Sequence, residues 1–475
     1  MRPTQHGSEW PRRGARYLAV AAAAGSLAVA ACNLDVVKPD VITPGTLSGA
    51  NSLPTIHDAA LGDFALAYSG SGADGSSGTE GIIMAGGLLA DEFVNSETFP
   101  TRIEVDRRNI QVTNSSVTGW FRTLMRARAS AEFAAHKYRQ LSPDTTKEAG
   151  FPEVIALSGY MYLFFAENYC SGVPVSNVLD DGTLQFGQPL TTQNMLDSAV
   201  ARFNAAIAAS NALGSSVSAA SKAKDLNLAT VGLGRALLDR AQTAADIATA
   251  AAAVVNVPTS FVYVVQHSTN STRENNGVYV AMAVAKRYAV ADSEGGNGLQ
   301  FRKKGDARTP FAQTGNGFDG VTPQYNQMRF VIQSDPDPLA TGVEARLIEA
   351  EASLAAGDTA TFLAKHNALR AAPPSYLAPV GQTIAPLAAL TTTGLTSSQV
   401  QDPHFKEREY WLWNSGHRLG DLRRLSRAPY SRNPESVFPT GAYFKGGLYG
   451  TDYNFPVPFD ETNNPNFTQC LDRNP

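Results

Sequence analysis

The stretch FKEREYWLWNSGHRLGDLRRL, residues 405–425, decides the fold. It predicts two helices that close the chain, separated by a turn at 414–416. The tryptophans Trp411 and Trp413 are expected in the core. The arginines here could hold an anionic ligand, but ion pairs across the closing helices are the favoured interpretation. The residues concerned are Arg418, Arg423, Arg424 and Arg427, with Glu407, Glu409 and Asp421 as their acidic partners.

Helical periodicity also dominates the chain before this stretch. Apolar residues recur every three or four positions, which is typical of amphipathic helices. The segments are 51–68, 82–93, 120–138, 152–170, 196–207, 226–241, 245–255, 343–354 and 362–370. Residues 160–165 are apolar nearly all round and are predicted to be buried. The pattern predicts a mainly α fold of stacked helix-turn-helix units, an α-α superhelix like tetratricopeptide repeats, although their exact repeat pattern is not satisfied.

Residues 257–342 differ from the helical segments around them. Glycine, asparagine, aspartate and proline dominate there, between two β-like runs at 261–265 and 279–285. This predicts an irregular insertion with a few short strands, and loops on a rigid scaffold are where ligands usually bind. Asp335 and Asp337 could ligate a structural calcium ion, but no EF-hand spacing surrounds them. Solvated turn carboxylates are the favoured interpretation, and no metal site is predicted.

The N-terminus reads as an export signal. Arginines precede an apolar run at 17–31, and small residues lead directly to Cys32. This order is typical of a secretory signal and resembles the bacterial lipobox, which implies cleavage after Ala31 and a covalent lipid on Cys32. An ordinary signal peptide with a chance cysteine is the alternative. Residues 1–31 are therefore interpreted as a lipoprotein signal peptide, 32–50 as an extended tether and 51–475 as a single helical domain.

Charge and cysteine content limit the partners. The net charge of −4 becomes about −7 without residues 1–31, which argues against nucleic acid as a partner. No other apolar stretch is long enough to cross a bilayer. Two cysteines remain after Cys32, and in an exported chain Cys170 and Cys470 either pair or lie apart as buried thiols.

Motifs for catalysis are weak. Ser221–Lys224 is a formal SxxK in a polar stretch with nothing to support it, and the glycines of 70–75 follow a helical pattern rather than a strand. The seven histidines are scattered without metal-ligand spacing. The adjacent carboxylates Asp91 and Glu92 point in different directions on a helix, which disfavours glycoside hydrolysis. We expect neither an enzyme nor a cofactor.

The order of the motifs resembles the SusD/RagB family of outer-membrane nutrient-binding lipoproteins. An early aromatic helix ends in glycine and proline, a helix pair follows the irregular middle, and the closing helices lead to a tyrosine-proline and asparagine-proline tail. The matching segments are 160–174, 344–351, 367–370, 407–409, 416–418, 421–424, 453–458 and 464–466. The resemblance depends on the order and spacing of these motifs rather than on any one of them. The family segment at the C-terminus is about 343–475.

The resemblance implies a binding protein on the outer face of the outer membrane. Such a protein captures oligosaccharide or peptide and delivers it to a SusC-like TonB-dependent transporter, without catalysis. Ligand sites in related proteins lie in loops near the first helices and in the irregular middle. This implies as ligand-binding candidates Phe99, Arg102, Asn109, Tyr288, Asn297 and Phe301. The alternatives are a lipid-anchored helical scaffold that binds envelope proteins, and a surface hydrolase.

Overall fold

The computed structural model describes residues 49–72, 80–179, 183–396, 399–467 and 469–475. The chain divides into two compact units, Met1–Ser52 and Leu53–Pro475. The described part of the first unit contains the short 3-10 helix Ala50–Ser52. The predicted signal peptide, Cys32 and the tether up to residue 48 lie outside the described residues. The second unit contains the helices and strands of the fold.

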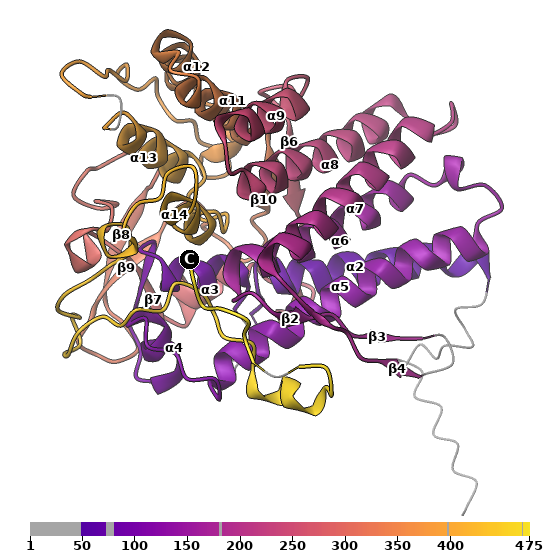
Figure 1. Ribbon diagram of the computed structural model, residues 1–475, viewed down its shortest axis with the longest axis horizontal. Helices are drawn as coiled ribbons and strands as arrows, with labels where there is room; N and C mark the ends of the chain where they lie inside the picture. Colours follow the sequence, from indigo (N-terminus) through magenta and orange to yellow (C-terminus); the bar gives the residue numbers. More distant parts are fainter. Residues whose placement is uncertain (1–48, 73–79, 180–182, 397–398, 468) are drawn as a thin grey trace, which may run out of the picture. The chain divides into compact units, whose positions relative to one another are not determined.

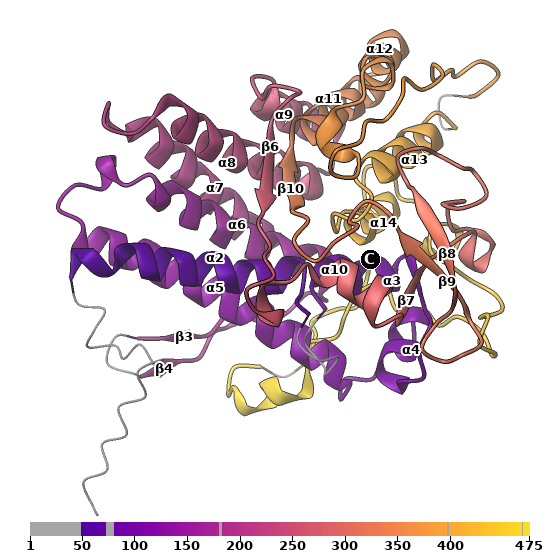
Figure 2. The same ribbon diagram turned by 180° about the vertical axis from the view of Figure 1, so that it is seen from behind.

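Eight helices of this unit pack in the order of the sequence. Each contacts the next, from α2 beside α5 to α11 beside α12. Figures 1 and 2 show this succession from indigo to orange. Their bounds are Leu53–Tyr68 (α2), Ser115–Leu141 (α5), Gly150–Asn168 (α6), Thr192–Ala212 (α7), Ala219–Arg240 (α8), Ala244–Val254 (α9), Gly342–Ala355 (α11) and Thr359–Ala371 (α12). The predicted mainly helical fold with only short strands is confirmed.

The core of the stack forms around α6. Every residue of α6 from Phe151 to Asn168 is buried, as the aromatic run at 160–165 predicted. Glycines allow α6 and α8 to approach the ring of Phe203 on α7. A Cβ atom at Gly232 would lie 2.3 Å from Phe203 Cε1, and one at Gly159 would lie 2.9 Å from the same atom. The three helices are therefore packed at a distance that only small residues permit.

The remaining elements are short and lie between or beside the helices. Among these remaining elements, the short α-helices are α3 (Ile82–Leu89), α4 (Pro100–Asp106) and α10 (Gly277–Tyr279). The strands form antiparallel pairs: β1 (Phe93–Asn95) with β7 (Tyr288–Val290), β2 (Val173–Pro174) with β5 (Pro189–Leu190), β3 (Asn177–Val178) with β4 (Leu184–Gln185), β6 (Val262–Val265) with β10 (Asp337–Thr341), and β8 (Phe311–Asn316) with β9 (Pro323–Gln327). The irregular insertion with a few strands is thus present as predicted.

Two local predictions in the insertion were wrong. The β-like run at 279–285 continues α10 as a π-helical turn, Val280–Val284. Asn276 begins this helix because its side chain accepts a hydrogen bond from the Tyr279 amide, and a short apolar run does not distinguish helix from strand. Asp335 and Asp337 are buried rather than solvated. Asp335 accepts from the amides of residues 331 and 332, and Asp337 accepts from the Asn276 side chain.

The closing helices α13 (Gln401–Trp411) and α14 (Arg418–Ser426) lie in the core, and both tryptophans are buried as predicted. Of the ion pairs predicted across these helices, the structure contains Arg424 with Asp421 at 2.9 Å and Arg418 with Glu409 at 3.8 Å. Asp421 also pairs with Arg408 at 2.8 Å, an arginine that was not among those predicted. Arginines of α14 also have partners outside the two closing helices, which the sequence did not indicate. Arg418 forms a bidentate pair with Asp91, next to α3. Arg423 instead donates to the carbonyl oxygens of Ala166 and Tyr169 at the end of α6.

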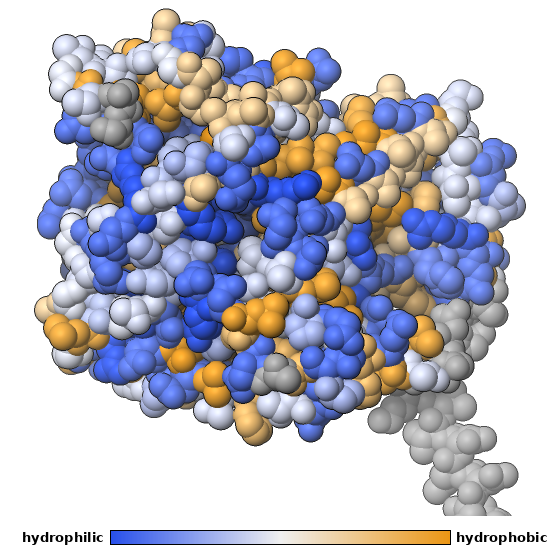
Figure 3. Space-filling model, in the orientation of Figure 1, coloured by the Kyte–Doolittle hydropathy of each residue, from blue (hydrophilic) through white to orange (hydrophobic). Residues whose placement is uncertain are grey.

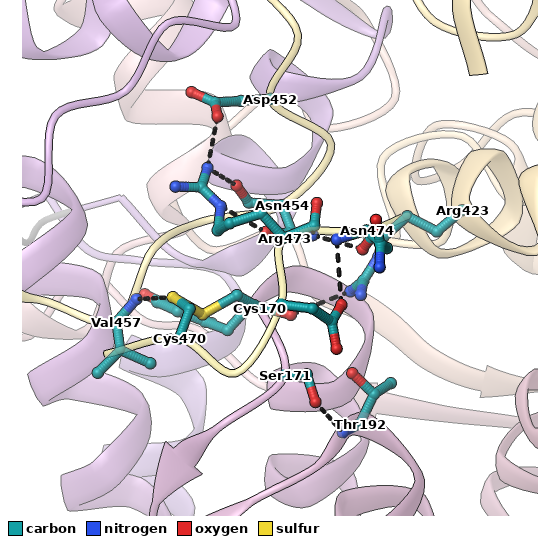
Figure 4. Close-up of a disulfide and its surroundings, with 12 residues drawn as sticks. Cys170, Ser171, Thr192, Arg423, Asp452, Asn454, Val457, Cys470, Arg473 and Asn474 are labelled. Carbon is teal, nitrogen blue, oxygen red and sulfur yellow. Dashed lines mark hydrogen bonds and ion pairs between the residues drawn. A yellow bond between two sulfur atoms is a disulfide. The ribbon is translucent and has the colours of Figure 1, made fainter. Parts of the chain in front are cut away.

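A disulfide joins Cys170 to Cys470, which are 300 positions apart in the sequence. Figure 4 shows the C-terminal segment beside the residues that follow α6. The Cys170 amide donates to Phe455 O, and the Leu471 amide donates to Ser171 O. Of the two arrangements that the sequence left open, the structure contains the pair. The bond fixes the C-terminal tail against the core.

Candidate ligand-binding surface

Two phenylalanine rings form an exposed surface, here called the aromatic platform. Phe99 precedes α4, and Phe318 lies in the loop between β8 and β9. Their exposed fractions are 41% and 53%, and the ring centroids lie 6.2 Å apart at an interplanar angle of 28°. The guanidinium of Arg287 lies 5.0 Å from one centroid and 5.1 Å from the other. Exposed apolar rings that rest on a cation in this way can stack on a flat apolar face of a ligand.

Backbone hydrogen bonds fix the two loops that carry the platform. The Phe318 amide donates to Lys286 O, and the Asp319 amide donates to Ser96 O. The Ser96 hydroxyl donates to Lys286 O at 3.0 Å. Figure 2 shows β8 and β9 next to β7 and α4. The loop with Phe318 joins β8 to β9, and the loop with Phe99 leads into α4. The platform is therefore positioned by several segments that are far apart in the sequence.

Buried charges support the platform from below. Glu97 has no exposed side-chain surface, and it pairs with Arg102 at 3.1 Å and Arg287 at 3.5 Å. Arg102 also pairs with Glu80 at 2.6 Å. Burial raises the pKa of Glu97, although both arginines oppose this effect. The network holds Arg287 under the rings, since its guanidinium has an acidic partner there.

A third segment meets the platform through Lys445. Its ammonium donates to Asn95 Oδ1, Glu97 O and Asp319 Oδ2, at 2.7 to 2.8 Å. Burial would raise the pKa of Asp319, but the bonds from Lys445 and Thr322 hold it at about 2. The ammonium lies 5.7 Å from the ring of Phe444, which is 46% exposed. Phe444 thus adds a third exposed ring to this neighbourhood.

Asp106 lies buried at the end of α4, between two of these segments. It accepts hydrogen bonds from the Asn95 amide at 2.7 Å and the Tyr443 hydroxyl at 2.8 Å. Burial raises the pKa of Asp106 to about 7, despite these two bonds. The carboxyl therefore connects the segment before Phe99 to the segment before Phe444.

The six residues predicted from the sequence do not form one site. Phe99 lies on the platform, whereas Arg102 is buried beneath it. Tyr288 and Phe301 have 0% exposure, which corrects the expectation that they contact ligand: Tyr288 belongs to β7, and Phe301 packs against Trp413. Asn109 is exposed after α4. Asn297 is exposed at a different cavity, and its amide donates to the carbonyls of Glu435 and Phe438.

Phe318 and Phe444 were missing from the sequence-based set. Each lies in a loop rich in glycine, TGNGFDG at 314–320, where Phe318 is the one aromatic residue, and TGAYFKGG at 440–447, where Phe444 follows the buried Tyr443. A large apolar side chain in such a loop has few neighbours to bury it, and this signal could have identified both residues.

No group of metal-binding side chains large enough to hold an ion occurs among the described residues. Within the same residues, none of the helices has both the length and the apolar character needed to cross a bilayer.

No protein-family model matches the sequence, and no curated protein matches it. Solved structures do match. A SusD-like carbohydrate-binding protein from Bacteroides fragilis is 16% identical, with 88% of this chain and 100% of that chain covered and a TM-score of 0.62. A SusD superfamily protein from Parabacteroides distasonis is 15% identical, with 89% and 98% covered and a TM-score of 0.61. A laminarin-binding SusD-like protein is 16% identical, with 89% and 99% covered and a TM-score of 0.60. These likenesses show the SusD-like fold that the sequence motifs predicted.

Proposed function

We propose that this chain, which has the SusD-like fold, binds oligosaccharides at the aromatic platform and does not transform them. The observation that carries this proposal is the pair of exposed, stacked rings of Phe99 and Phe318 over Arg287. Sugar rings present flat C–H faces that pack on aromatic rings, while their hydroxyls bond to polar neighbours. Two similar structures bear names that describe carbohydrate or laminarin binding, which supports the same class of ligand.

The same proposal includes an anchor and a partner. Cys32 carries the lipid, and the chain lies on the outer membrane beside a TonB-dependent transporter that receives the captured sugar. The lipobox-like sequence before Cys32 supports the anchor. Two proteins confined to one membrane meet at a high effective concentration, so a weak contact between them is sufficient for transfer.

The test of ligand binding is calorimetric titration of the purified chain with laminarin, after a glycan array has surveyed other polymers. We expect Phe99→Ala and Phe318→Ala each to weaken binding about threefold to tenfold, because one aromatic contact is removed. Phe133→Ala is the matched control, since Phe133 is 40% exposed on α5 and does not belong to the platform. Equal binding by all variants, or no binding to any glycan on the array, would contradict the proposal.

The test of anchoring is the partition of the chain between membrane and soluble fractions after expression in a Gram-negative host. We expect Cys32→Ser to move the mature protein to the soluble fraction, because stable attachment requires acyl chains on this residue. Asn33→Ser is the matched control, because it alters the neighbouring residue and keeps Cys32 and the disulfide cysteines. The anchor is refuted if the Cys32→Ser protein stays with the membranes as firmly as the unaltered chain.

A further inference from the structure

A polar cavity of about 640 Å³, separate from the aromatic platform, lies beside α13. Its walls come from three segments: residues 296–308, the end of α12 with the loop at 389–391, and one side of α13 from Pro403 to Tyr410. The volume falls within the range of about 300 to 1,000 Å³ typical of small-ligand sites. None of its lining residues belongs to the aromatic platform. In Figure 3 the surface between the positions of α13 and β8 in Figure 1 is mostly blue to white, hence hydrophilic.

The floor of this cavity is a closed ion-pair network. Both terminal nitrogens of the Arg308 guanidinium donate to Glu407, at 2.7 and 3.0 Å. Arg308 also forms two bonds with Asp306, and Arg370 donates to Glu407 at 2.6 Å. Two acids thus neutralise two arginines, and all four side chains are held in place.

Two further lysines leave the cavity with an excess of positive charge. Lys304 and Lys406 are exposed and line it, and within the described ranges neither has an ion-pair partner. The lining then has four cations and two anions. Tyr410 and Gln300 also line the cavity, and among the residues that the structure describes their side chains have no hydrogen-bond partner. Free ammonium, hydroxyl and amide groups are suited to a ligand that has both a carboxylate and hydroxyls.

We propose that this cavity binds a carboxylate-bearing sugar, such as a uronic acid unit of an acidic oligosaccharide. The carboxylate lies between the Lys304 and Lys406 ammoniums, and the ring hydroxyls meet Tyr410 and Gln300. The inference rests on the proposed function for its choice of a saccharide, and it adds a charge preference that the platform does not provide. Because both lysines are exposed, the attraction weakens as salt is added.

The experiment is a calorimetric titration of the full chain with trigalacturonate at low salt. We expect the double variant Lys304→Ala/Lys406→Ala to bind it about threefold to tenfold more weakly, since exposed ion pairs contribute modestly. Lys303→Ala is the matched control, because Lys303 is exposed and faces Asp292 at 3.7 Å instead of lining the cavity. Each variant is compared by circular dichroism, and a loss of binding counts only with unchanged folding.

Two further ligands separate this inference from its alternatives. A neutral trisaccharide should bind without any effect of the two lysines, and triglutamate should bind more weakly than trigalacturonate. The inference is overturned if the lysine variants bind trigalacturonate as the unaltered chain does, if Lys303→Ala weakens it equally, or if triglutamate binds as tightly. Platform variants such as Phe99→Ala report on the proposed function separately, since they should alter laminarin binding and leave the effect of the two lysines unchanged.

Discussion

Asp106 is a single residue whose titration can be measured, because its pKa lies near neutrality. Burial raises this pKa to about 7 from an ordinary value of 3.8. Between these two values the folded chain keeps a proton that the unfolded chain has lost. The contribution of Asp106 to the free energy of unfolding is therefore fully present below about pH 4 and is lost as the pH rises toward 7. The free energy of unfolding changes in this range by up to about 1.4 kcal/mol per pH unit.

We expect Asp106→Asn to remove this component of the pH dependence. The amide is neutral at every pH, and its oxygen can still accept a hydrogen bond from the Asn95 amide or the Tyr443 hydroxyl. The measurement is the free energy of unfolding in urea from pH 4 to 8, for both proteins. The free energy of unfolding of the unaltered chain minus that of Asp106→Asn should decrease steadily as the pH rises. Parallel curves would mean that the carboxyl titrates normally in the folded chain.

Whether an individual side chain contacts ligand was harder to predict from the sequence than its chemical type suggests. Arg102, Tyr288 and Phe301 are residue types that bind sugars well, but burial removes them from any surface ligand. Exposure depends on which distant segments cover a side chain, and periodicity does not contain that information. Phe99 was found because a loop beside an early helix is a plausible site, whereas Phe318 reaches the same surface through the unpredictable pairing of β8 with β9.

At the level of elements, the helical segments were predicted well because each buries a periodic apolar face. The buried stripe of α2, from Leu53 to Ala67, has the predicted spacing. Segment ends were less accurate: α3 ends at Leu89, and Phe93 begins β1. The segment 82–93 does not mark the change from helix to strand, which requires knowledge of the partner strand β7.

Two glycines inside helices provide a matched prediction. A Cβ at Gly232 on α8 would meet Phe203, whereas one at Gly62 on α2 has nothing within 4 Å. We expect Gly232→Ala to lower the free energy of unfolding by about 1–3 kcal/mol through overpacking. Gly62→Ala should instead raise it by up to about 1 kcal/mol, because alanine favours the helix. Urea denaturation measures both, and a loss of stability at Gly62 as large as that at Gly232 would argue against the close packing around Phe203.

For the whole molecule, the disulfide connects the middle of the chain to its end. The sequence left the pairing of Cys170 and Cys470 open, because two cysteines 300 positions apart can have almost any separation in space. The fold brings them together because the tail packs along the residues after α6, where Tyr169 also pairs with Phe455. A contact of this kind depends on the complete topology and is not encoded in either local sequence.

The size of this loop predicts a large effect on stability. Closing a loop of 300 residues restricts the unfolded chain, and the chain-entropy model assigns the bond about 6 kcal/mol. We expect the double variant Cys170→Ser/Cys470→Ser to unfold at clearly lower urea concentration than the unaltered chain. A reducing agent should destabilise the unaltered chain to the same level and leave the double variant unchanged, which separates loss of the bond from any effect of the serines. Two free thiols in the denatured, unreduced protein would instead show that the cysteines do not pair, and the stability of the tail would then depend on its hydrogen bonds to Cys170 and Ser171.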